Sequence, residues 1–264
     1  MSAPATPPEA EAPLTFEIEG QVGIITFNRP GKLNAMTPEM AELLVAAVER
    51  CNESDEVRAV VLTGTGKAFC AGSDISLLET YATAWDFRNR TEYCDALRGL
   101  RKPSIAAING YAFGGGLEMA LSCDIRIAAA TARLAAPEIK LGWIGGGGMT
   151  ALLTHSIGPS NAAMMVMTGD PVSADLALAW GLVGEVHPAD ALRFRAIEVA
   201  ATIASRAPIA AETAKSNLAA ALNMPLEQAI AYERDLQTVC FATEDALEGR
   251  AAFAGKRAPV FRRR

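Results

Sequence analysis

Asn109 to Ala128 reads NGYAFGGGLEMALSCDIRIA, in which three consecutive glycines lead directly into a segment with the composition of a buried helix. A run of three glycines is a poor start for a helix, because each glycine costs backbone entropy and adds no packing. Glu118 then stands among apolar residues, where burial of a carboxylate is costly. The stretch predicts either a helix packed very closely on a strand or a site where another molecule's polar atom contacts the backbone at Gly114–Gly116.

The composition of the whole chain indicates a globular protein with its own core. The 264 residues are half apolar and one-fifth charged, enough for one large domain or two small ones. The net charge of −6 argues against nucleic acid as a partner, and no apolar run approaches the roughly 18 residues of a membrane helix. The five cysteines form no C-x-x-C pair, and the N-terminus lacks the basic start and apolar stretch of a secretory signal. We therefore predict reduced thiols, no membrane partner and a cytoplasmic location.

Several common catalytic centres find no support in the sequence. His155 and His187 are the only imidazoles, too few for a zinc cluster, so no metal is expected. No G-x-S-x-G motif is present, and Gly66-Lys67 lacks the rest of a phosphate-binding loop. Hydrolase triads and nucleoside triphosphatases are therefore disfavoured.

Strand and helix patterns alternate along the chain, which predicts an α/β fold that coils repeatedly on itself. Residues 16–28 predict a hairpin that turns at Glu19-Gly20, and Thr37 caps a helix that has Pro38 in its first turn. A long helical stretch is predicted from about Ile75 to Leu100. The other expected elements are strands over residues 58–64, 104–110, 124–130 and 132–138, and a helix over residues 151–157.

Three segments follow from these patterns. Residues 1–12, rich in proline, alanine and glutamate, are predicted to form a disordered tail. Residues 13–205 are predicted to form the core. The pattern is helical after about Pro188, and residues 206–264 form a C-terminal helical region that belongs to the same domain, because no flexible linker separates the two.

Two turns from strand to helix predict a binding site for one oxygen atom. The helix that begins at Gly114–Gly116 presents unpaired N–H groups and a partial positive charge. Residues 69–74, with the sequence FCAGSD, form a second such turn, for which the alternative is an ordinary helix cap by Asp74. Two turns that each offer one N–H to the same carbonyl oxygen form an oxyanion hole.

Glu138 is a second acid among apolar residues, at the end of the strand predicted over residues 132–138. Two carboxyls in one pocket of low dielectric constant repel each other, so one pKa rises and the pair can supply an acid and a base at neutral pH. The alternative for Glu118 or Glu138 is a structural salt bridge to Arg126 or Arg133.

Four motifs together resemble the crotonase superfamily, specifically its enoyl-CoA hydratase/isomerase branch. In chain order they are KAFCAGSDI (67–75), NGYAFGGGLEMALSCDIRIAA (109–129), APEIKLGW (136–143) and ALAWGLVGEV (177–186). The resemblance extends from about Pro13 to the C-terminus. It implies a ββα superhelical (spiral) core, followed by a helical C-terminal region that builds a trimer or a dimer of trimers.

The resemblance also implies roles for individual residues. The backbone N–H groups of Ser73 and Gly115 would hold the thioester oxygen of an acyl-CoA. Glu118 would orient and deprotonate a water molecule, and Glu138 would supply the proton to the α-carbon, the two acting as a coupled pair. No cofactor is implied, because coenzyme A is part of the substrate.

Further positions are implied to contact CoA, some of them from a neighbouring subunit. They are Gly31, Lys32, Ala71, Asp74, Ile75, Phe253 and Lys256. Lys32 and Lys256 suit the phosphates of CoA electrostatically, and a solvated surface lysine is the alternative for each.

Some positions depart from the usual hydratase pattern. Ser73 replaces a common alanine, Gly145 stands where proline is usual, and Trp143 is bulkier than the usual residue, which leaves the length and shape of the acyl group open. Gly146 occupies the place where dienoyl-CoA isomerases and aryl-CoA dehalogenases of the superfamily carry an aspartate, which counts against both activities. The leading hypothesis is a 2-enoyl-CoA hydratase. The alternatives are a Δ3,Δ2-enoyl-CoA isomerase, which needs Glu138 alone, and a catalytically silent acyl-CoA-binding protein.

Overall fold

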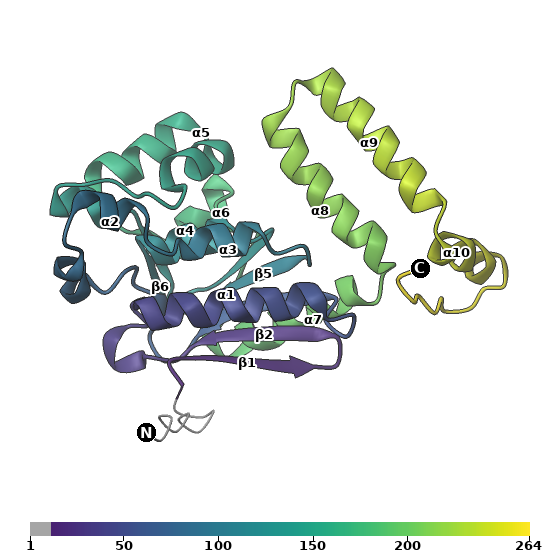
Figure 1. Ribbon diagram of the computed structural model, residues 1–264, viewed down its shortest axis with the longest axis horizontal. Helices are drawn as coiled ribbons and strands as arrows, with labels where there is room; N and C mark the ends of the chain where they lie inside the picture. Colours follow the sequence, from purple (N-terminus) through teal and green to yellow (C-terminus); the bar gives the residue numbers. More distant parts are fainter. Residues whose placement is uncertain (1–11) are drawn as a thin grey trace.

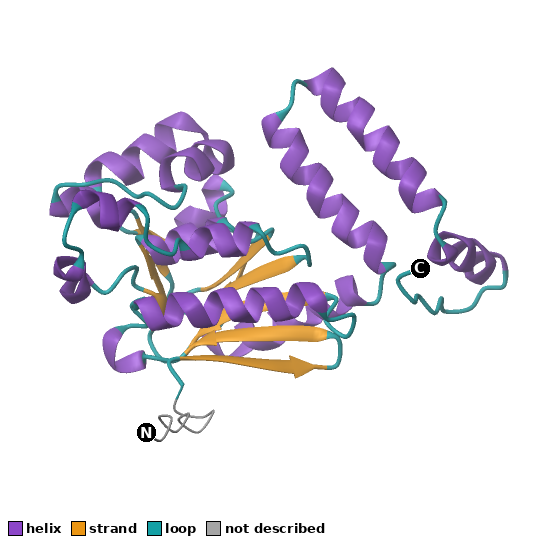
Figure 2. Cartoon of the chain, viewed as in Figure 1, coloured by secondary structure: helices purple, strands orange, loops and turns teal. Residues whose placement is uncertain are grey.

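A computed structural model of the chain describes residues 12–264, so the tail predicted over residues 1–12 lies outside the described residues except for Ala12. Strands form the centre of the molecule, helices surround them, and a purely helical region follows (Figure 2). The α/β architecture that the sequence predicts is confirmed.

Ten strands and a larger number of helices make up the described part of the chain. The strands are β1 (Leu14–Glu19), β2 (Val22–Phe27), β3 (Ala59–Gly64), β4 (Ala68–Cys70), β5 (Ser104–Ile108), β6 (Tyr111–Phe113), β7 (Ile125–Ala129), β8 (Arg133–Ala135), β9 (Val172–Ser173) and β10 (Glu185–His187). The α-helices are α1 (Pro38–Glu53), α2 (Ala84–Arg88), α3 (Tyr93–Arg98), α4 (Gly115–Leu121), α5 (Met149–Thr168), α6 (Ala174–Trp180), α7 (Ala189–Ala204), α8 (Pro208–Asn223), α9 (Leu226–Phe241) and α10 (Glu244–Ala254). Short 3₁₀ helices are η2 (Pro30–Lys32), η3 (Ile75–Thr80) and η4 (Pro137–Leu141).

The first elements form as their local sequence predicts. β1 and β2 pair antiparallel around the Glu19-Gly20 turn, and Gly20 has the positive φ that such a turn requires. The Thr37 side chain accepts a hydrogen bond of 3.2 Å from the Met40 N–H and caps α1. The predicted hairpin and the predicted cap are both confirmed.

The strands belong to two sheets, and the chain alternates between them. The first sheet has the order β1-β2-β3-β5-β7-β10, and the second has the order β4-β6-β8-β9. After the hairpin the chain forms three pairs of consecutive strands, β3 and β4, β5 and β6, and β7 and β8. The first strand of each pair joins the first sheet and the second strand joins the second sheet, and helices follow each pair. This repeated strand–strand–helix unit winds the chain into a spiral, in which β4, β6 and β8 are parallel neighbours. Their carboxyl ends therefore meet at one edge of the second sheet, where parallel sheets commonly bind ligands.

Both faces of the first sheet are buried. Along β3, Ala59 and Val61 pack toward α7, whereas Val60 and Leu62 pack toward α1 and α3. The alternation follows from the period of two residues in a strand, and burial on both sides explains why β3 is apolar throughout.

The long helix predicted from Ile75 to Leu100 is wrong, because the segment is divided into η3, α2 and α3. Each piece begins with its own side-chain cap, from Asp74, Thr83 and Glu92 respectively. A capping residue has an extended backbone conformation, so three caps interrupt what the composition presents as one helix.

The helices α8, α9 and α10 extend away from the sheets, and α8 and α9 form an antiparallel hairpin (Figure 1). Lys102 of the core is fully buried and pairs with Glu212 of α8 at 3.0 Å, while Lys215 of α8 pairs with Asp124 at 2.9 Å. These ion pairs attach α8 to the core. Within residues 12–264, none of the helices combines the length and the apolar character that a membrane crossing requires.

The cysteines are unpaired thiols, as the sequence predicts, and four of the five are buried. Burial raises the pKa of Cys51, Cys70 and Cys123 to about 12, so these thiols stay protonated at neutral pH. They act as small apolar core residues.

Candidate active site

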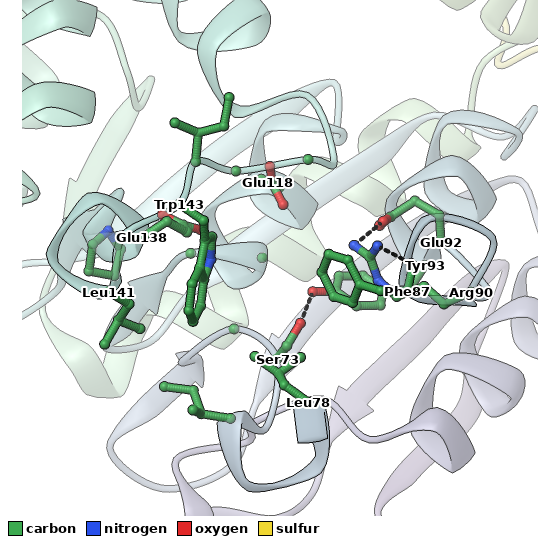
Figure 3. A pocket seen from close by; sticks show the side chains of 18 of the residues that line it. Ser73, Leu78, Phe87, Arg90, Glu92, Tyr93, Glu118, Glu138, Leu141 and Trp143 are labelled. Atoms are coloured by element: carbon green, nitrogen blue, oxygen red, sulfur yellow. Dashed lines mark hydrogen bonds and ion pairs between the residues drawn. The ribbon is translucent and has the colours of Figure 1, made fainter. Parts of the chain in front are cut away.

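A cleft of about 800 Å³ opens at the edge of the second sheet where β4, β6 and β8 end. The loop after β4 lines it with Ala71–Ser73, the loop after β6 with Gly114 and Gly115, and η4 with Glu138. The parallel order of the three short strands thus brings together segments that lie far apart in sequence (Figure 3).

The turns after β4 and β6 touch each other in this cleft. A Cβ atom built on Gly72 would lie 3.2 Å from the Gly115 nitrogen and 3.0 Å from the Phe113 carbonyl oxygen. Among residues 12–264, the backbone N–H groups of Ser73 and Gly115 have no hydrogen-bond acceptor. Gly115 is the first residue of α4, so its free N–H also lies at the positive end of a helix dipole.

Each of the three glycines is required for a separate reason. Gly114 has φ +53° and ψ −128°, and a Cβ there would lie 2.8 Å from Glu138 Oε1. A Cβ on Gly115 would lie 2.0 Å from the Tyr93 hydroxyl oxygen, and one on Gly116 would lie 2.0 Å from the Cys70 carbonyl oxygen. Close packing of α4 on β4 therefore explains Gly116. At Gly114 and Gly115 a Cβ would collide with Glu138 and Tyr93, two side chains that line the cleft.

Glu118 is only 4% exposed, although it lines the cleft. Its Oε1 atom accepts hydrogen bonds from the backbone N–H groups of Gly147 at 2.8 Å and Met149 at 3.2 Å. Burial raises the pKa of this carboxyl, the two N–H groups lower it, and the charge of Glu138 raises it further. The Oε2 atom has no hydrogen-bond partner among the described residues, whereas Oε1 has two.

Glu138 lies in the first turn of η4. Its Oε2 atom is buried and has no hydrogen-bond partner within residues 12–264. Burial also raises the pKa of this carboxyl. A buried polar atom without a partner is unusual in a folded protein, and active sites are one place where it occurs.

The alternative of a structural salt bridge does not apply to either glutamate. The Arg126 guanidinium donates to the Leu182 and Cys123 carbonyls and to the Ser156 hydroxyl. Arg133 donates to the carbonyls of Thr131 and Ala132. Neither arginine is bonded to Glu118 or Glu138, so the two carboxyls are not held by arginine charges.

The structure places some of the predicted CoA residues at the cleft and others elsewhere. Ala71 and Ile75 line the cleft. Asp74 does not, because its carboxylate pairs with Arg29 at 3.2 Å and accepts a hydrogen bond of 2.7 Å from the Ser76 hydroxyl. Gly31 and Lys32 are exposed in η2, outside the cleft lining.

Phe253 and Lys256 lie at the end of α10, beyond the α8–α9 hairpin and far from α2 and α4 (Figure 1). The Phe253 side chain is 88% exposed. Within a single chain these two residues are not brought to the cleft.

One wall of the cleft consists of residues that the sequence patterns do not single out. Arg90 donates to Glu92 at 2.8 Å and stacks over the Phe87 ring at 4.2 Å, and Tyr93 lies beside them (Figure 3). Trp143, 41% exposed, lies on the other side with Leu141. The caps at Thr83 and Glu92 are the only sequence signal for this wall, since they divide the segment that carries it.

Over residues 17–264 the chain matches the family model for enoyl-CoA hydratase/isomerase. The chain belongs to the enoyl-CoA hydratase/isomerase family. It is 41% identical over 253 residues to a probable enoyl-CoA hydratase of Mycobacterium bovis, covering 95% of this chain and 98% of that protein. It is 42% identical over 242 residues to a mitochondrial enoyl-CoA hydratase of Pongo abelii, covering 91% of this chain and 83% of that protein.

Solved structures agree with the family assignment. The crystal structure of an enoyl-CoA hydratase from Bacillus anthracis superimposes with a TM-score of 0.91 at 35% identity, covering 96% of this chain and 100% of that chain. This confirms the crotonase-like spiral core and the helical C-terminal region that the four sequence motifs imply. The protein is thus an enzyme of the enoyl-CoA hydratase/isomerase family, and the cleft at the ends of β4, β6 and β8 is its candidate active site.

Proposed function

We propose that the protein is a 2-enoyl-CoA hydratase, which adds water across the 2,3 double bond of an acyl-CoA thioester. The observation that carries the proposal is the pair of Glu118 and Glu138 in one cleft, each with an unpartnered carboxyl oxygen, beside two backbone N–H groups without acceptors. Hydration requires a base, an acid and a means of stabilising the negative charge that develops on the thioester oxygen. These groups supply all three, and no cofactor is needed.

The backbone groups act on the thioester oxygen. In the proposed complex the N–H groups of Ser73 and Gly115 donate hydrogen bonds to this oxygen and withdraw electrons from the conjugated double bond. The β-carbon thereby becomes open to attack by water. Each such donor stabilises the transition state by about 3–4 kcal/mol in a site from which water is excluded.

The two carboxyl groups of Glu118 and Glu138 transfer the protons. Glu118, fixed through Oε1 by two N–H groups, uses Oε2 to take a proton from the attacking water as the new carbon–oxygen bond forms at the β-carbon. The π electrons move onto the α-carbon and the thioester oxygen, and Glu138 Oε2 delivers a proton to the α-carbon. One water is added in total. The pair then exchanges a proton and returns to its starting state, so both pKa values belong to the coupled pair.

The two alternatives use the same cleft differently. A Δ3,Δ2-enoyl-CoA isomerase needs only Glu138, which would move one proton between two carbons. A silent acyl-CoA-binding protein needs neither carboxylate. The fixed geometry of Glu118 favours hydration, because two N–H groups hold Oε1 and leave Oε2 without a hydrogen-bond partner, as a base that activates water requires.

A panel of 2-enoyl-CoA thioesters of different chain lengths tests the proposal. The conjugated enoyl group absorbs in the ultraviolet, and hydration removes the conjugation. We expect the absorbance of at least one thioester to fall in proportion to the amount of enzyme. If none of the panel is consumed while acyl-CoA still binds, the protein is a binding protein rather than a hydratase.

The positions of CoA and of neighbouring subunits belong to the same proposal. CoA extends along Ala71 to Ile75 toward Gly31 and Lys32, where the lysine attracts the phosphates. Phe253 and Lys256 reach the CoA of a neighbouring subunit, which agrees with their exposure at the far end of a single chain. The cytoplasmic location stays a prediction.

We expect a trimer or a dimer of trimers in solution. The helical region carries large apolar side chains that a single chain leaves exposed, and such surfaces mark interfaces between proteins. They are Leu218, Leu222, Leu226, Val239, Phe241, Leu247 and Phe253. Analytical ultracentrifugation at micromolar concentration measures the assembly, and a stable monomer would contradict the expectation.

Replacement of Gly115 isolates the backbone donor. Gly115→Pro removes the N–H and introduces a ring, whereas Gly115→Ala introduces a Cβ at the same place and keeps the N–H. Both variants press on Tyr93, since any Cβ at Gly115 lies 2.0 Å from the Tyr93 hydroxyl oxygen. We expect kcat for Gly115→Pro to be about a hundredfold below that of Gly115→Ala, because only the proline variant lacks the donor. Equal rates in the two variants would show that this N–H takes no part.

A further inference from the structure

Two side-chain hydroxyls lie next to the proposed oxyanion hole. The Ser73 hydroxyl oxygen and the Tyr93 hydroxyl oxygen are 3.0 Å apart and share one hydrogen bond (Figure 3). Two hydroxyls carry two hydrogens, and their mutual bond uses one of them. Among residues 12–264 neither oxygen has another hydrogen-bond partner, so one O–H group remains without an acceptor.

The pair is placed against both backbone donors. Ser73 contributes one of the free N–H groups itself. Tyr93, the first residue of α3, packs on Gly115, whose missing Cβ would lie 2.0 Å from the hydroxyl oxygen and 3.0 Å from the ring carbon that bears it. The tyrosine hydroxyl therefore lies directly over the residue that contributes the other free N–H. Ser73, Tyr93 and Gly115 all line the cleft.

The tyrosine is held in place and keeps its proton. Its side chain is only 6% exposed, and α3, which carries it, packs against α1 and α4. Burial raises the pKa of the phenol well above its usual value, so it is a neutral hydrogen-bond donor throughout the physiological pH range. A fixed, neutral donor costs little reorganisation when negative charge develops nearby.

We propose that Tyr93 is a third hydrogen-bond donor of the oxyanion hole. Its O–H points to the acyl oxygen of the thioester, while the Ser73 O–H donates to the tyrosine oxygen. The inference rests on the proposed function of the cleft. Tyr93 is then a catalytic residue, because it touches the reacting group, and the Ser73 side chain is a positioning group that acts through it. No proton leaves the tyrosine during the reaction. The hydroxyl only shares its hydrogen with an oxygen whose charge increases and then decreases.

The direction of the two hydrogen bonds follows from their chemistry. A phenol is a stronger donor than an aliphatic hydroxyl, so it is better suited to face the developing anion. A hydrogen bond received from Ser73 polarises the phenol further, because successive hydrogen bonds in a chain strengthen each other.

Tyr93→Phe tests the inference, because it keeps the ring on Gly115 and removes only the hydroxyl. We expect kcat to fall about 10–100-fold with little change in KM, since the donor acts mainly on the charge that develops in the transition state. The matched control is Tyr111→Phe on β6, an exposed tyrosine outside the cleft lining, which should retain the wild-type kcat. A loss of packing alone would instead lower thermal stability or raise KM.

A binding measurement tests the same contact without turnover. A conjugated 2,4-dienoyl-CoA bound to Glu138→Gln absorbs at longer wavelength when hydrogen bonds polarise its carbonyl. We expect this red shift to decrease when Tyr93→Phe is added. An unchanged shift together with an unchanged kcat would overturn the inference, as would the absence of any shift in the chain that has Tyr93. If the red shift depends on the Tyr93 hydroxyl but the protein hydrates no thioester, the role of Tyr93 as a donor stands and only the proposed hydratase function is refuted.

A double-mutant cycle separates the two hydroxyls. Ser73→Ala keeps the backbone N–H, so we expect it to lower kcat by no more than a few fold in the presence of Tyr93. In the Tyr93→Phe background the same change should have no further effect, because the serine hydroxyl acts only through the phenol. Equal effects of Ser73→Ala in both backgrounds would contradict this arrangement.

Discussion

Glu138→Gln is expected to abolish turnover, with a loss of about 10⁴-fold or more in kcat, at the upper limit of what a positioned acid–base group contributes. Glutamine has nearly the same shape as glutamate but cannot exchange a proton with carbon. Glu118, the other carboxyl of the cleft, is fixed through Oε1 by two backbone N–H groups, and in the proposed mechanism it serves the water rather than the α-carbon. Both hydration of 2-enoyl-CoA and isomerisation of 3-enoyl-CoA should disappear, because each reaction moves a proton at the α-carbon.

Binding and folding measurements complete the test of Glu138→Gln. Titration calorimetry with an acyl-CoA should show affinity close to that of the wild type, since in the proposed complex the backbone N–H groups of Ser73 and Gly115 hold the thioester. Circular dichroism should show an unchanged fold. A variant that folds, binds and still hydrates at more than about one-tenth of the wild-type rate would exclude Glu138 as the proton donor, because general acid–base catalysis typically contributes far more.

Glu118→Gln is expected to lower the rate of hydration by about 10²–10⁴-fold. The amide oxygen of glutamine can still accept the hydrogen bonds of the Gly147 and Met149 N–H groups, so the local structure should persist. The variant loses only the ability to accept a proton from water. Isomerisation of a 3-enoyl-CoA, where the enzyme catalyses it, should be much less affected, because it depends on Glu138.

The ratio of the two rates in Glu118→Gln therefore distinguishes the two activities. Hydration is followed by the loss of enoyl absorbance, and isomerisation by its appearance from a 3-enoyl-CoA. A full rate of hydration in this variant would remove the water-activating role from Glu118 and would favour the isomerase.

The parts of the fold that sequence predicts are those determined by near neighbours along the chain. The hairpin at Glu19-Gly20 and the cap at Thr37 depend on residues within a few positions, and both are found. β4, β6 and β8 are only three residues long, too short for a periodic pattern, and their existence depends on pairing with one another. Sequence alone therefore gives the alternating strands and helices but not the two separate sheets.

The residues of the candidate site also fall into those that the sequence predicts and those that it does not. Glycines and acids at strand-to-helix turns are visible in the sequence, and Ser73, Gly115, Glu118 and Glu138 are indeed at one cleft. Tyr93 could not be predicted as a site residue, because its proposed role depends on contacts with Ser73 and Gly115. Each of these residues is about twenty positions away along the chain. The segment from Ile75 to Leu100 was predicted as one helix, so the cleft wall that contains Tyr93 could not be recognised.

In the proposed reaction the two carboxylates add water to an enoyl-CoA whose thioester oxygen is held by the backbone. Incubation of the wild-type enzyme with a 2-enoyl-CoA of six or more carbons in ²H₂O, followed by NMR of the acyl group, tests it most directly. We expect a 3-hydroxyacyl-CoA with one deuterium on the α-carbon, delivered by Glu138 after exchange with solvent. A 3-enoyl-CoA that carries deuterium on the α-carbon and no hydroxyl group, or a thioester recovered unchanged, would contradict it.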